Sequence, residues 1–176
     1  IYQKTYLETA QTDIKAALKI ADSLYTISET PLFKTKSLML SATLYKQSGD
    51  VKNAIQYALE SEKIIEQTDN YIWQSRVLGF LASQYRALKL YGRSKQYLDK
   101  SFGIINKIEN PKLVNSTMGL MLQELAYVEL EQKNYKKSIT NINKAQTYFN
   151  LTPDNLDFFT TNNEQLLGLN YYHLKD

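Results

Sequence analysis

The residue types that perform catalysis are scarce in this 176-residue chain and are not arranged for it. The absence of cysteine excludes a thiolate nucleophile, a disulfide and a cysteine-ligated metal. The one histidine, His173, has no serine and acid in a triad context, and no His, Asp and Glu cluster has metal-ligand spacing. Glu60 with Glu62, and Glu129 with Glu131, are two residues apart and point to different sides of a helix. We therefore predict no enzymatic activity, no small-molecule substrate, no cofactor and no metal site.

Basic residues offer a different chemistry, the binding of anionic groups. Lys36 and Arg76 are 40 residues apart, and Lys46 and Arg86 have the same separation. Cations repeated at a fixed interval favour a ligand that carries acidic groups. Lysines and arginines on helices also form ordinary solvated surfaces, so this second interpretation of the same four residues stays open.

Charge is distributed unevenly along the chain. The segment from Tyr71 to Lys112 has 8 basic and 2 acidic residues, a net charge of +6, whereas Leu151 to Asp176 has a net charge of −3. The basic segment raises direct nucleic-acid binding as an alternative function. Two features disfavour it: the total charge is only +3, and no single helix concentrates the basic residues.

The elements that position these residues are predicted to be helices. Apolar residues recur at helical spacing, as Ala54, Ile55, Ala58 and Ile65 do between Val51 and Ile65, and strict alternation is rare. With only 6 glycines and 3 prolines, the composition argues against a turn-rich β-sandwich. No stretch approaches the 18 apolar residues of a membrane span. The fold class is predicted to be all-α.

Four predicted helix starts reveal an internal repeat. Thr30-Pro31, Asn110-Pro111 and Thr152-Pro153 each place a capping side chain before a proline at the first helical position, and Asp69-Asn70-Tyr71 has the cap without the proline. These starts lie at residues 31, 71, 111 and 153, spaced by 40, 40 and 42 residues. The chain is therefore divided into a partial repeat at 1–30, repeats at 31–70, 71–110 and 111–152, and the first helix of another at 153–176.

Small residues recur inside each repeat, where they would allow two antiparallel helices to approach closely. In the first helix of each pair they are Ala42, Ala82, Ala126 and Gly168. In the second helix they are Ala54, Ser94 and Ser138, followed seven residues later by Ser61, Ser101 and Ala145. Tyrosines that could fill the groove between the helices follow three of the first set by three residues, at Tyr45, Tyr85 and Tyr171, and Glu129 takes this place in the third repeat.

This pattern resembles the tetratricopeptide repeat, a helix-turn-helix unit of about 34 residues. Leu167-Gly168-Leu169-Asn170-Tyr171 is similar to its Leu-Gly-x-x-Tyr core, and the turn from Ser48 to Ala54 is similar to its turn. The period of 40 to 44 residues and the missing consensus tryptophan depart from the family pattern, and the longer helices resemble those of bacterial regulators. The resemblance implies a solenoid of antiparallel helix pairs wound into a right-handed α-α superhelix.

In that family, first-helix residues line the inner groove of the superhelix, which binds protein or peptide partners. The matching side chains here are Lys36, Met39, Thr43, Lys46, Arg76, Gly79, Ser83, Arg86, Gln123, Tyr127, Asn162, Gln165 and Tyr172. Such a groove, basic at its front and polar-aromatic at its rear, would suit an extended peptide with acidic groups. Chaperone-tail binding is disfavoured because Met39 and Thr43 replace the clamp residues. Trp73 is interpreted as a packing residue, and Lys46→Glu with Arg86→Glu is expected to weaken binding without affecting the fold.

The two ends of the sequence suggest a longer protein. The chain begins at Ile1 without a methionine, and the last predicted helix has no second helix behind it. We expect the native chain to continue beyond Asp176, or this helix to pack against another copy in a homodimer. By resemblance, the region would be the sensor or interaction part of a bacterial signalling or transcription-regulatory protein. A self-assembly scaffold stays open as an alternative.

Overall fold

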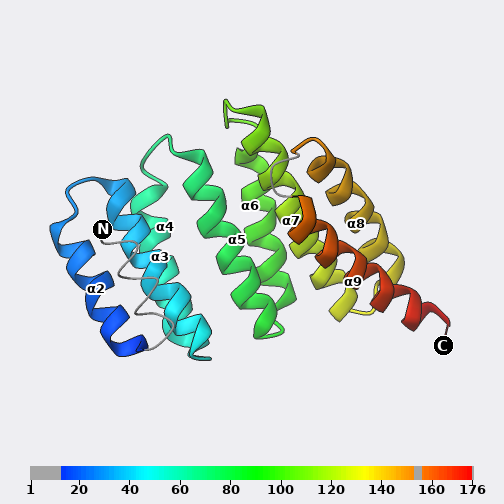
Figure 1. Ribbon diagram of the computed structural model, residues 1–176, viewed down its shortest axis with the longest axis horizontal. Helices are drawn as coiled ribbons and strands as arrows, with labels where there is room; N and C mark the ends of the chain where they lie inside the picture. Colours follow the sequence, from blue (N-terminus) through cyan, green and yellow to red (C-terminus); the bar gives the residue numbers. More distant parts are fainter. Residues whose placement is uncertain (1–12, 153–155, 176) are drawn as a thin grey trace. The chain divides into compact units, whose positions relative to one another are not determined.

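The computed structural model describes residues 13–152 and 156–175, and its described residues contain eight helices and no strand. The all-α prediction is therefore confirmed. In chain order the helices are α2 (Ile14–Ile27), α3 (Pro31–Gln47), α4 (Val51–Ile65), α5 (Tyr71–Ala87), α6 (Tyr91–Ile105), α7 (Pro111–Glu131), α8 (Tyr135–Asn150) and α9 (Leu156–Lys175) (Figure 1). None of the described helices is both long and apolar enough to cross a membrane.

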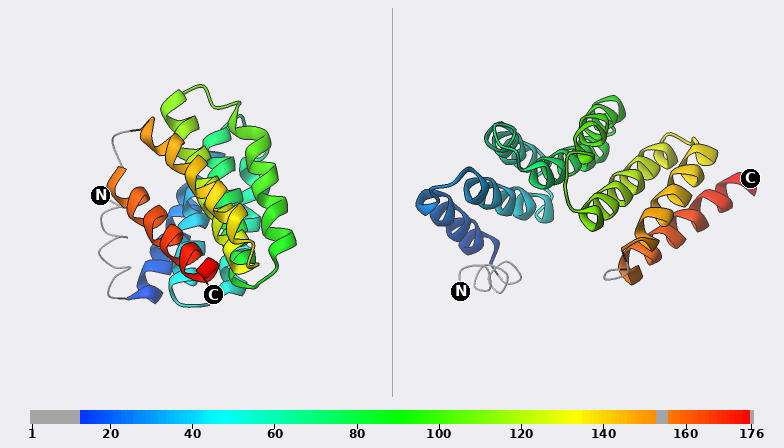
Figure 2. Two further views of the ribbon diagram at one scale, coloured as in Figure 1. Left: turned by 90° about the vertical axis from the view of Figure 1, so that its right-hand side faces the viewer. Right: turned by 90° about the horizontal axis from the view of Figure 1, so that it is seen from above.

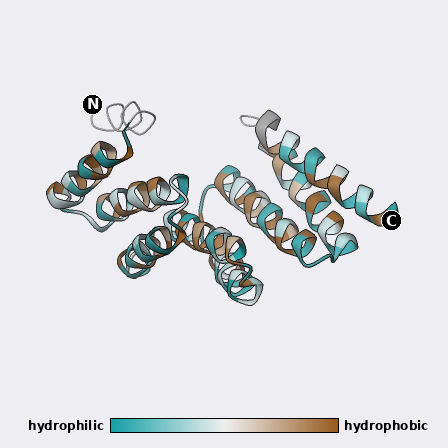
Figure 3. Cartoon of the chain, turned by 90° about the horizontal axis from the view of Figure 1, so that it is seen from below, coloured by the Kyte–Doolittle hydropathy of each residue, from teal (hydrophilic) through white to brown (hydrophobic). Residues whose placement is uncertain are grey.

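The chain forms two compact units, and the boundary between them falls inside α5, between Gln84 and Tyr85. In the first unit, α2 packs on α3 through Ala17, Ala21 and Leu44, and α3 packs on α4. In the second unit, α8 packs against both α7 and α9, and the three helices lie side by side (Figure 2). Each described helix carries both hydrophobic and hydrophilic residues (Figure 3), and apolar residues at helical spacing let a helix bury one side.

The predicted caps explain where the first helices begin. The Thr30 hydroxyl accepts a hydrogen bond from the Phe33 N–H at 3.3 Å, and the side-chain oxygen Oδ1 of Asn70 accepts one from the Trp73 N–H at 3.1 Å. Asn110 caps α7 in the same way, through the N–H groups of Lys112 and Leu113. Three of the four predicted starts are therefore confirmed. The fourth, at Pro153, lies outside the described residues, as do residues 1–12 of the predicted partial repeat.

The turns within the three helix pairs share one backbone geometry. A residue with positive φ occupies equivalent places at Gly49, Lys89 and Lys133, spaced by 40 and 44 residues. The next N–H in each turn donates to a carbonyl five residues earlier: Asp50 to Tyr45 at 2.8 Å, Leu90 to Tyr85 at 2.9 Å and Asn134 to Glu129 at 2.8 Å. The same hydrogen bond closes the end of each first helix, so the repeat seen in the sequence is also a repeat of local structure.

The small residues predicted within each helix pair are buried. Ala42, Ala82 and Ala126 are fully buried, as are the matching Ala54, Ser94 and Ser138 on the second helices. The Ser138 hydroxyl donates to the Ala126 carbonyl at 2.8 Å, which ties α8 to α7. The tyrosine prediction holds twice, because Tyr45 stacks on Tyr57 and Tyr85 stacks on Tyr97, each with ring centroids 5.3 Å apart.

The register predicted for the last helix is wrong. Gly168 is exposed, with nothing within 4 Å of a Cβ added there, and Tyr171 is 52% exposed. The residues of α9 that pack on α8 are instead Asn163, Leu166 and Asn170, spaced by three and four residues and all nearly inaccessible. The Asn170 side-chain amide donates to the Ser138 hydroxyl at 2.9 Å, so Asn170 occupies the contact predicted for Gly168.

Candidate functional site

A cluster of cations and aromatic rings lies on α3 and α5 in the first unit. The Lys36 ammonium lies 5.1 Å from the centroid of the Phe33 ring and 5.5 Å from that of Trp73. The Arg76 guanidinium lies 5.1 Å from the same Trp73 centroid. Two predicted groove residues from different helices therefore share one indole ring. We call Lys36, Trp73 and Arg76, together with Phe33, the tryptophan cluster.

Local structure fixes this cluster near the beginnings of the two helices. Phe33 and Lys36, like Trp73 and Arg76, are three residues apart, a spacing that places both members on one side of a helix. The Asn70 cap holds the backbone of Trp73. The amide of Gln74 donates to the carbonyls of Thr68 at 2.6 Å and Ile65 at 3.3 Å, which attaches the first turn of α5 to the end of α4.

The electrostatics of the cluster favour an anion. Because both cations lie near one ring, Lys36 Nζ and Arg76 Cζ are at most about 10.6 Å apart. Neither forms an ion pair with a carboxylate in the part of the chain that the structure describes. Like charges at this distance repel, and an anionic group placed between them would remove that repulsion. Arg76 and Phe33 are exposed and Lys36 is partly exposed, so a ligand can reach the cluster.

Lys46 extends the basic surface along the same two helices. Its ammonium is exposed and lies 5.7 Å from the centroid of the Phe80 ring on α5, and it has no described ion pair. Met39 and Thr43, the other predicted groove residues of α3, are partly exposed. The Thr43 hydroxyl donates to the Met39 carbonyl at 2.7 Å within α3. Together with the tryptophan cluster, these residues form what we call the α3–α5 face.

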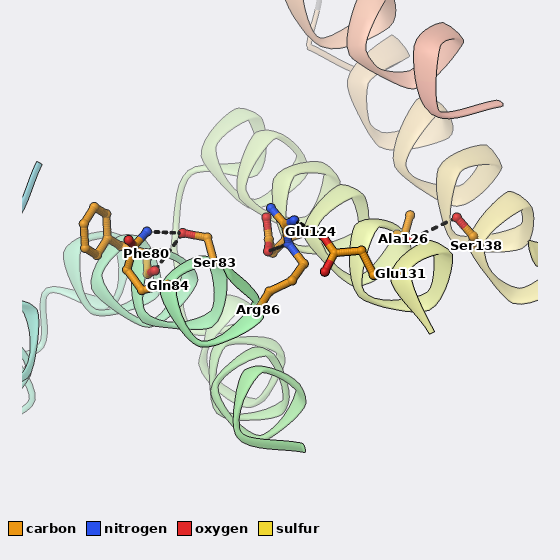
Figure 4. A network of polar contacts seen from close by, with 8 residues as sticks. All are labelled: Phe80, Ser83, Gln84, Arg86, Glu124, Ala126, Glu131 and Ser138. Carbon is orange, nitrogen blue, oxygen red and sulfur yellow. Dashed lines mark hydrogen bonds and ion pairs between the residues drawn. The ribbon is translucent and has the colours of Figure 1, made fainter. Parts of the chain in front are cut away.

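Ser83 is less available than predicted. Its side chain is partly buried, donates to the Phe80 carbonyl at 2.8 Å and accepts from the Gln84 amide at 2.9 Å (Figure 4). Both bonds of this hydroxyl are thus made within α5, and we do not assign it a role in binding.

Arg86 is not the free cation that the repeat predicts. In the second unit its guanidinium lies between two carboxylates of α7, with Nε 2.6 Å from Glu124 Oε1 and Nη1 bonded to Glu131 Oε1 (Figure 4). It also lies 4.9 Å from the centroid of the predicted groove residue Tyr127. Burial alone would lower the pKa of Arg86, but hydrogen bonds and charge from Glu124 and Glu131 raise it above its ordinary value. Arg86 thus joins α5 to α7, and its charge is already compensated.

The predicted rear of the groove does not form one lining. Gln123 is only 6% exposed, and its amide donates to Asn163 at 2.8 Å and to the Phe159 carbonyl at 3.3 Å. It packs inside the contact between α7 and α9 and is not an accessible groove residue. Gln165 and Tyr172 are exposed on α9 and Asn162 is partly exposed.

Glu129, which replaces the repeated tyrosine, joins α6 to α7. Its side chain is nearly buried, lies 2.7 Å from Lys95 Nζ and accepts from the Asn134 amide at 2.7 Å. Burial alone would raise the pKa of Glu129, but the hydrogen bonds from Lys95 and Asn134 and the charges of Lys95 and Lys137 lower it. Glu129 takes the sequence place of Tyr45 and Tyr85, but its ion pair reaches back to α6, whereas each tyrosine stacks on the second helix of its own pair.

Acid should weaken this contact. Because the pKa of Glu129 is lowered in the folded state, its stabilising contribution is complete above the unfolded-state pKa and is lost as pH falls through the folded value. We expect Glu129→Gln to lower the free energy of unfolding at pH 7 by about 1–2 kcal/mol, and the difference from wild type to shrink in acid below about pH 4. Urea unfolding at pH 7 and pH 3 measures this, with the exposed Glu60→Gln as control. An equal difference at both pH values would contradict the assignment.

Sequence reasoning missed three kinds of participant in these sites. The interpretation of Trp73 as a packing residue leaves out that its ring is partly exposed beneath two cations. Phe33 and Phe80 were not considered, although each lies beneath a predicted groove lysine. The carboxylates that bind Arg86 were also missed. The spacing of Glu124, Tyr127 and Glu131, by three and four residues, places them on one side of α7 and was the available signal.

His173, the one histidine of the chain, packs against aromatic rings. His173 stacks on Tyr135 of α8 with ring centroids 5.3 Å apart and meets the edge of Tyr172. Among the described residues no three His, Asp or Glu side chains are placed to hold a metal ion.

Comparison with known proteins adds no assignment. No protein-family model matches the chain, and no curated protein matches its sequence significantly. The functional conclusions therefore depend on the geometry described above.

Proposed function

We propose that this chain is a non-catalytic, protein-binding helical-repeat domain whose α3–α5 face binds an acidic peptide segment. The observation that carries the proposal is the pair of cations over Trp73, Lys36 and Arg76, which have no carboxylate partner among the described side chains. The difference in ion pairing between these two cations and Arg86 supports the proposal. Arg86, at the position that matches Lys46, is neutralised within the second unit, whereas Lys36, Lys46 and Arg76 have no carboxylate partner among the described residues.

The ligand chemistry follows from the side chains of the face. Arg76 can donate two parallel hydrogen bonds to a carboxylate, and Lys36 and Lys46 act as more mobile point charges. Phe33, Trp73 and Phe80 provide apolar contact next to each charge. An extended segment with acidic residues beside aromatic or aliphatic ones satisfies both requirements, as would a free C-terminal carboxylate.

We further propose that the helix pairs belong to a tetratricopeptide-like, right-handed superhelical solenoid. The support is the shared turn, with its positive φ residue and its hydrogen bond, and the buried small residues at intervals of 40 and 44. In this view the domain is the sensor or interaction part of a larger signalling or transcription-regulatory protein, a proposal that depends on the resemblance of the sequence to that family.

Direct binding of nucleic acid is the weaker alternative. Two cations of the basic middle segment are paired with carboxylates of α7, Arg86 with Glu124 and Glu131, and Lys95 with Glu129. These pairs reduce the positive charge that would face a phosphate backbone. Binding of nucleic acid would decrease steeply with added salt and would depend little on sequence.

Selection from a random 12-residue peptide display library tests the proposal. We expect selected peptides to be enriched in Asp and Glu next to aromatic residues. The best peptide, labelled with fluorescein, should lose at least about tenfold in affinity for the variant Lys36→Gln with Arg76→Gln, because the charged hydrogen bonds to its carboxylates are lost.

The matched control is Lys15→Gln with Lys19→Gln on α2, which removes the same charge from two exposed positions of the same unit. It should leave the affinity unchanged, and circular dichroism should be the same for both variants. Enrichment of basic peptides, or equal losses of affinity in the two double variants, would overturn the proposed site.

A further inference from the structure

The outward side of α9 carries an unusual set of exposed residues. Opposite the buried Asn163, Leu166 and Asn170, a stripe consists of Glu164, Gly168, Tyr171 and Lys175, which are spaced by four, three and four residues and are all exposed. This spacing places them in one line along the helix. Tyr172, next to Tyr171 in the chain, is 66% exposed beside this line, and Leu169 and Leu174 are exposed on other sides of the helix.

Nothing in the described chain covers this stripe. A Cβ added at Gly168 meets no atom within 4 Å, although the same addition at Gly119 in α7 would collide with a buried ring. Neither Glu164 nor Lys175 has a described hydrogen bond or ion pair. The Tyr171 and Tyr172 rings are both exposed at this end of the helix, and neighbouring exposed apolar side chains are typical of an interaction surface.

The stripe is complementary to a reversed copy of itself. If a second α9 lies antiparallel, with the two-fold axis between residues 169 and 170, Glu164 of each copy faces Lys175 of the other. The same operation places the Tyr171 ring of each copy over Gly168 of the other, where the missing side chain leaves room for it. A single two-fold rotation therefore forms both Glu164–Lys175 pairs and places both Tyr171 rings over the Gly168 residues. A parallel arrangement would instead bring Glu164 against Glu164 and Lys175 against Lys175.

We propose that the outward side of α9 is a self-association surface that binds a second copy of this chain, antiparallel, in an isologous dimer. The occupant is identified by this charge complementarity within the stripe. The surface lies in the second unit, so the dimer does not depend on the peptide site of the α3–α5 face.

Sedimentation velocity over a dilution series from about 1 to 500 µM measures the dimer directly, in the range where small interfaces associate. We expect the wild-type chain to form dimers within it. Glu164→Lys and Lys175→Glu should each weaken self-association at least about tenfold, since two attractive pairs become repulsive. The double variant with both changes, and an equimolar mixture of the two single variants, should restore dimers.

The exposed Glu60→Lys on α4 is the control for net charge and should leave dimerisation unchanged. Thermal unfolding at low concentration verifies that each variant is folded. A wild-type chain that stays monomeric over the whole series would overturn the proposal. If neither charge change weakens dimerisation, or if the mixture does not restore it, the antiparallel stripe is not the contact.

Discussion

Gly119→Ala should destabilise the protein by about 1–3 kcal/mol, although alanine is the better helix former. Gly119 is buried in α7, and a Cβ there would lie 2.4 Å from Cε1 of Phe149 and under 3.0 Å from two more of its ring atoms. Phe149 is 1% exposed and stacks on Phe159 with centroids 4.8 Å apart, so its ring has little room to move. The collision should outweigh the gain of about 1 kcal/mol in helix propensity.

Gly103→Ala is the matched control, because Gly103 is exposed within α6 and its added Cβ meets nothing within 4 Å. It should stabilise the protein by about 0.5–1 kcal/mol. Combining Gly119→Ala with Phe149→Leu should cost less than the sum of the single changes, since the smaller side chain relieves the collision. Urea unfolding of the wild type, the three single variants and the double variant measures these differences. A stabilising Gly119→Ala would show that α7 and α8 do not pack as described.

Arg86→Glu should lower the free energy of unfolding by about 2–4 kcal/mol. The change removes the cation that bonds to Glu124 and Glu131 and places a third carboxylate between them, over the ring of Tyr127. The side chains of Arg86 and Glu124 are only 22% and 15% exposed, so water screens this repulsion poorly. The ion pairs therefore lead us to expect a loss of stability, where the sequence alone predicts that reversing this charge leaves the fold intact.

Lys46→Glu is the control that the repeat itself provides, since Lys46 precedes Arg86 by 40 residues and has no carboxylate partner among the residues that the structure describes. It loses only the contact with Phe80 and should cost less than about 1 kcal/mol. Chemical denaturation of the two single variants compares them directly. Similar losses of stability would mean that the Arg86 ion pairs contribute nothing to folding.

Much of the fold could be predicted because its signals are local. Thr30, Asn70 and Asn110 act as caps through N–H groups only two or three residues away, and these caps placed the starts of α3, α5 and α7 correctly. Alanine and serine at fixed intervals predicted the buried contacts within helix pairs, because close approach of two backbones requires small side chains.

The site could be predicted only in part, because the carboxylates that neutralise a basic side chain can lie far from it in the sequence. Arg86 resembles Lys46 in the sequence, and the partners that distinguish them lie 38 and 45 residues beyond Arg86. The register of α9 failed for a related reason. A buried amide, Asn170, takes the contact predicted for Gly168, and its hydrogen bonds to the Ser138 hydroxyl and the Leu166 carbonyl offset the cost of burying its N–H groups. Neither the partners of Arg86 nor that of Asn170 on α8 can be identified from residue types and spacing alone.

Emission from Trp73 gives the most direct test of the proposed peptide site. It is the single tryptophan of the chain and lies beneath both Lys36 and Arg76. Titration with the best selected acidic peptide, synthesised without tryptophan, should shift or quench this emission, with a midpoint equal to the Kd from fluorescein anisotropy. If that peptide binds by anisotropy while the emission of Trp73 stays unchanged to saturation, the α3–α5 face is not where it binds.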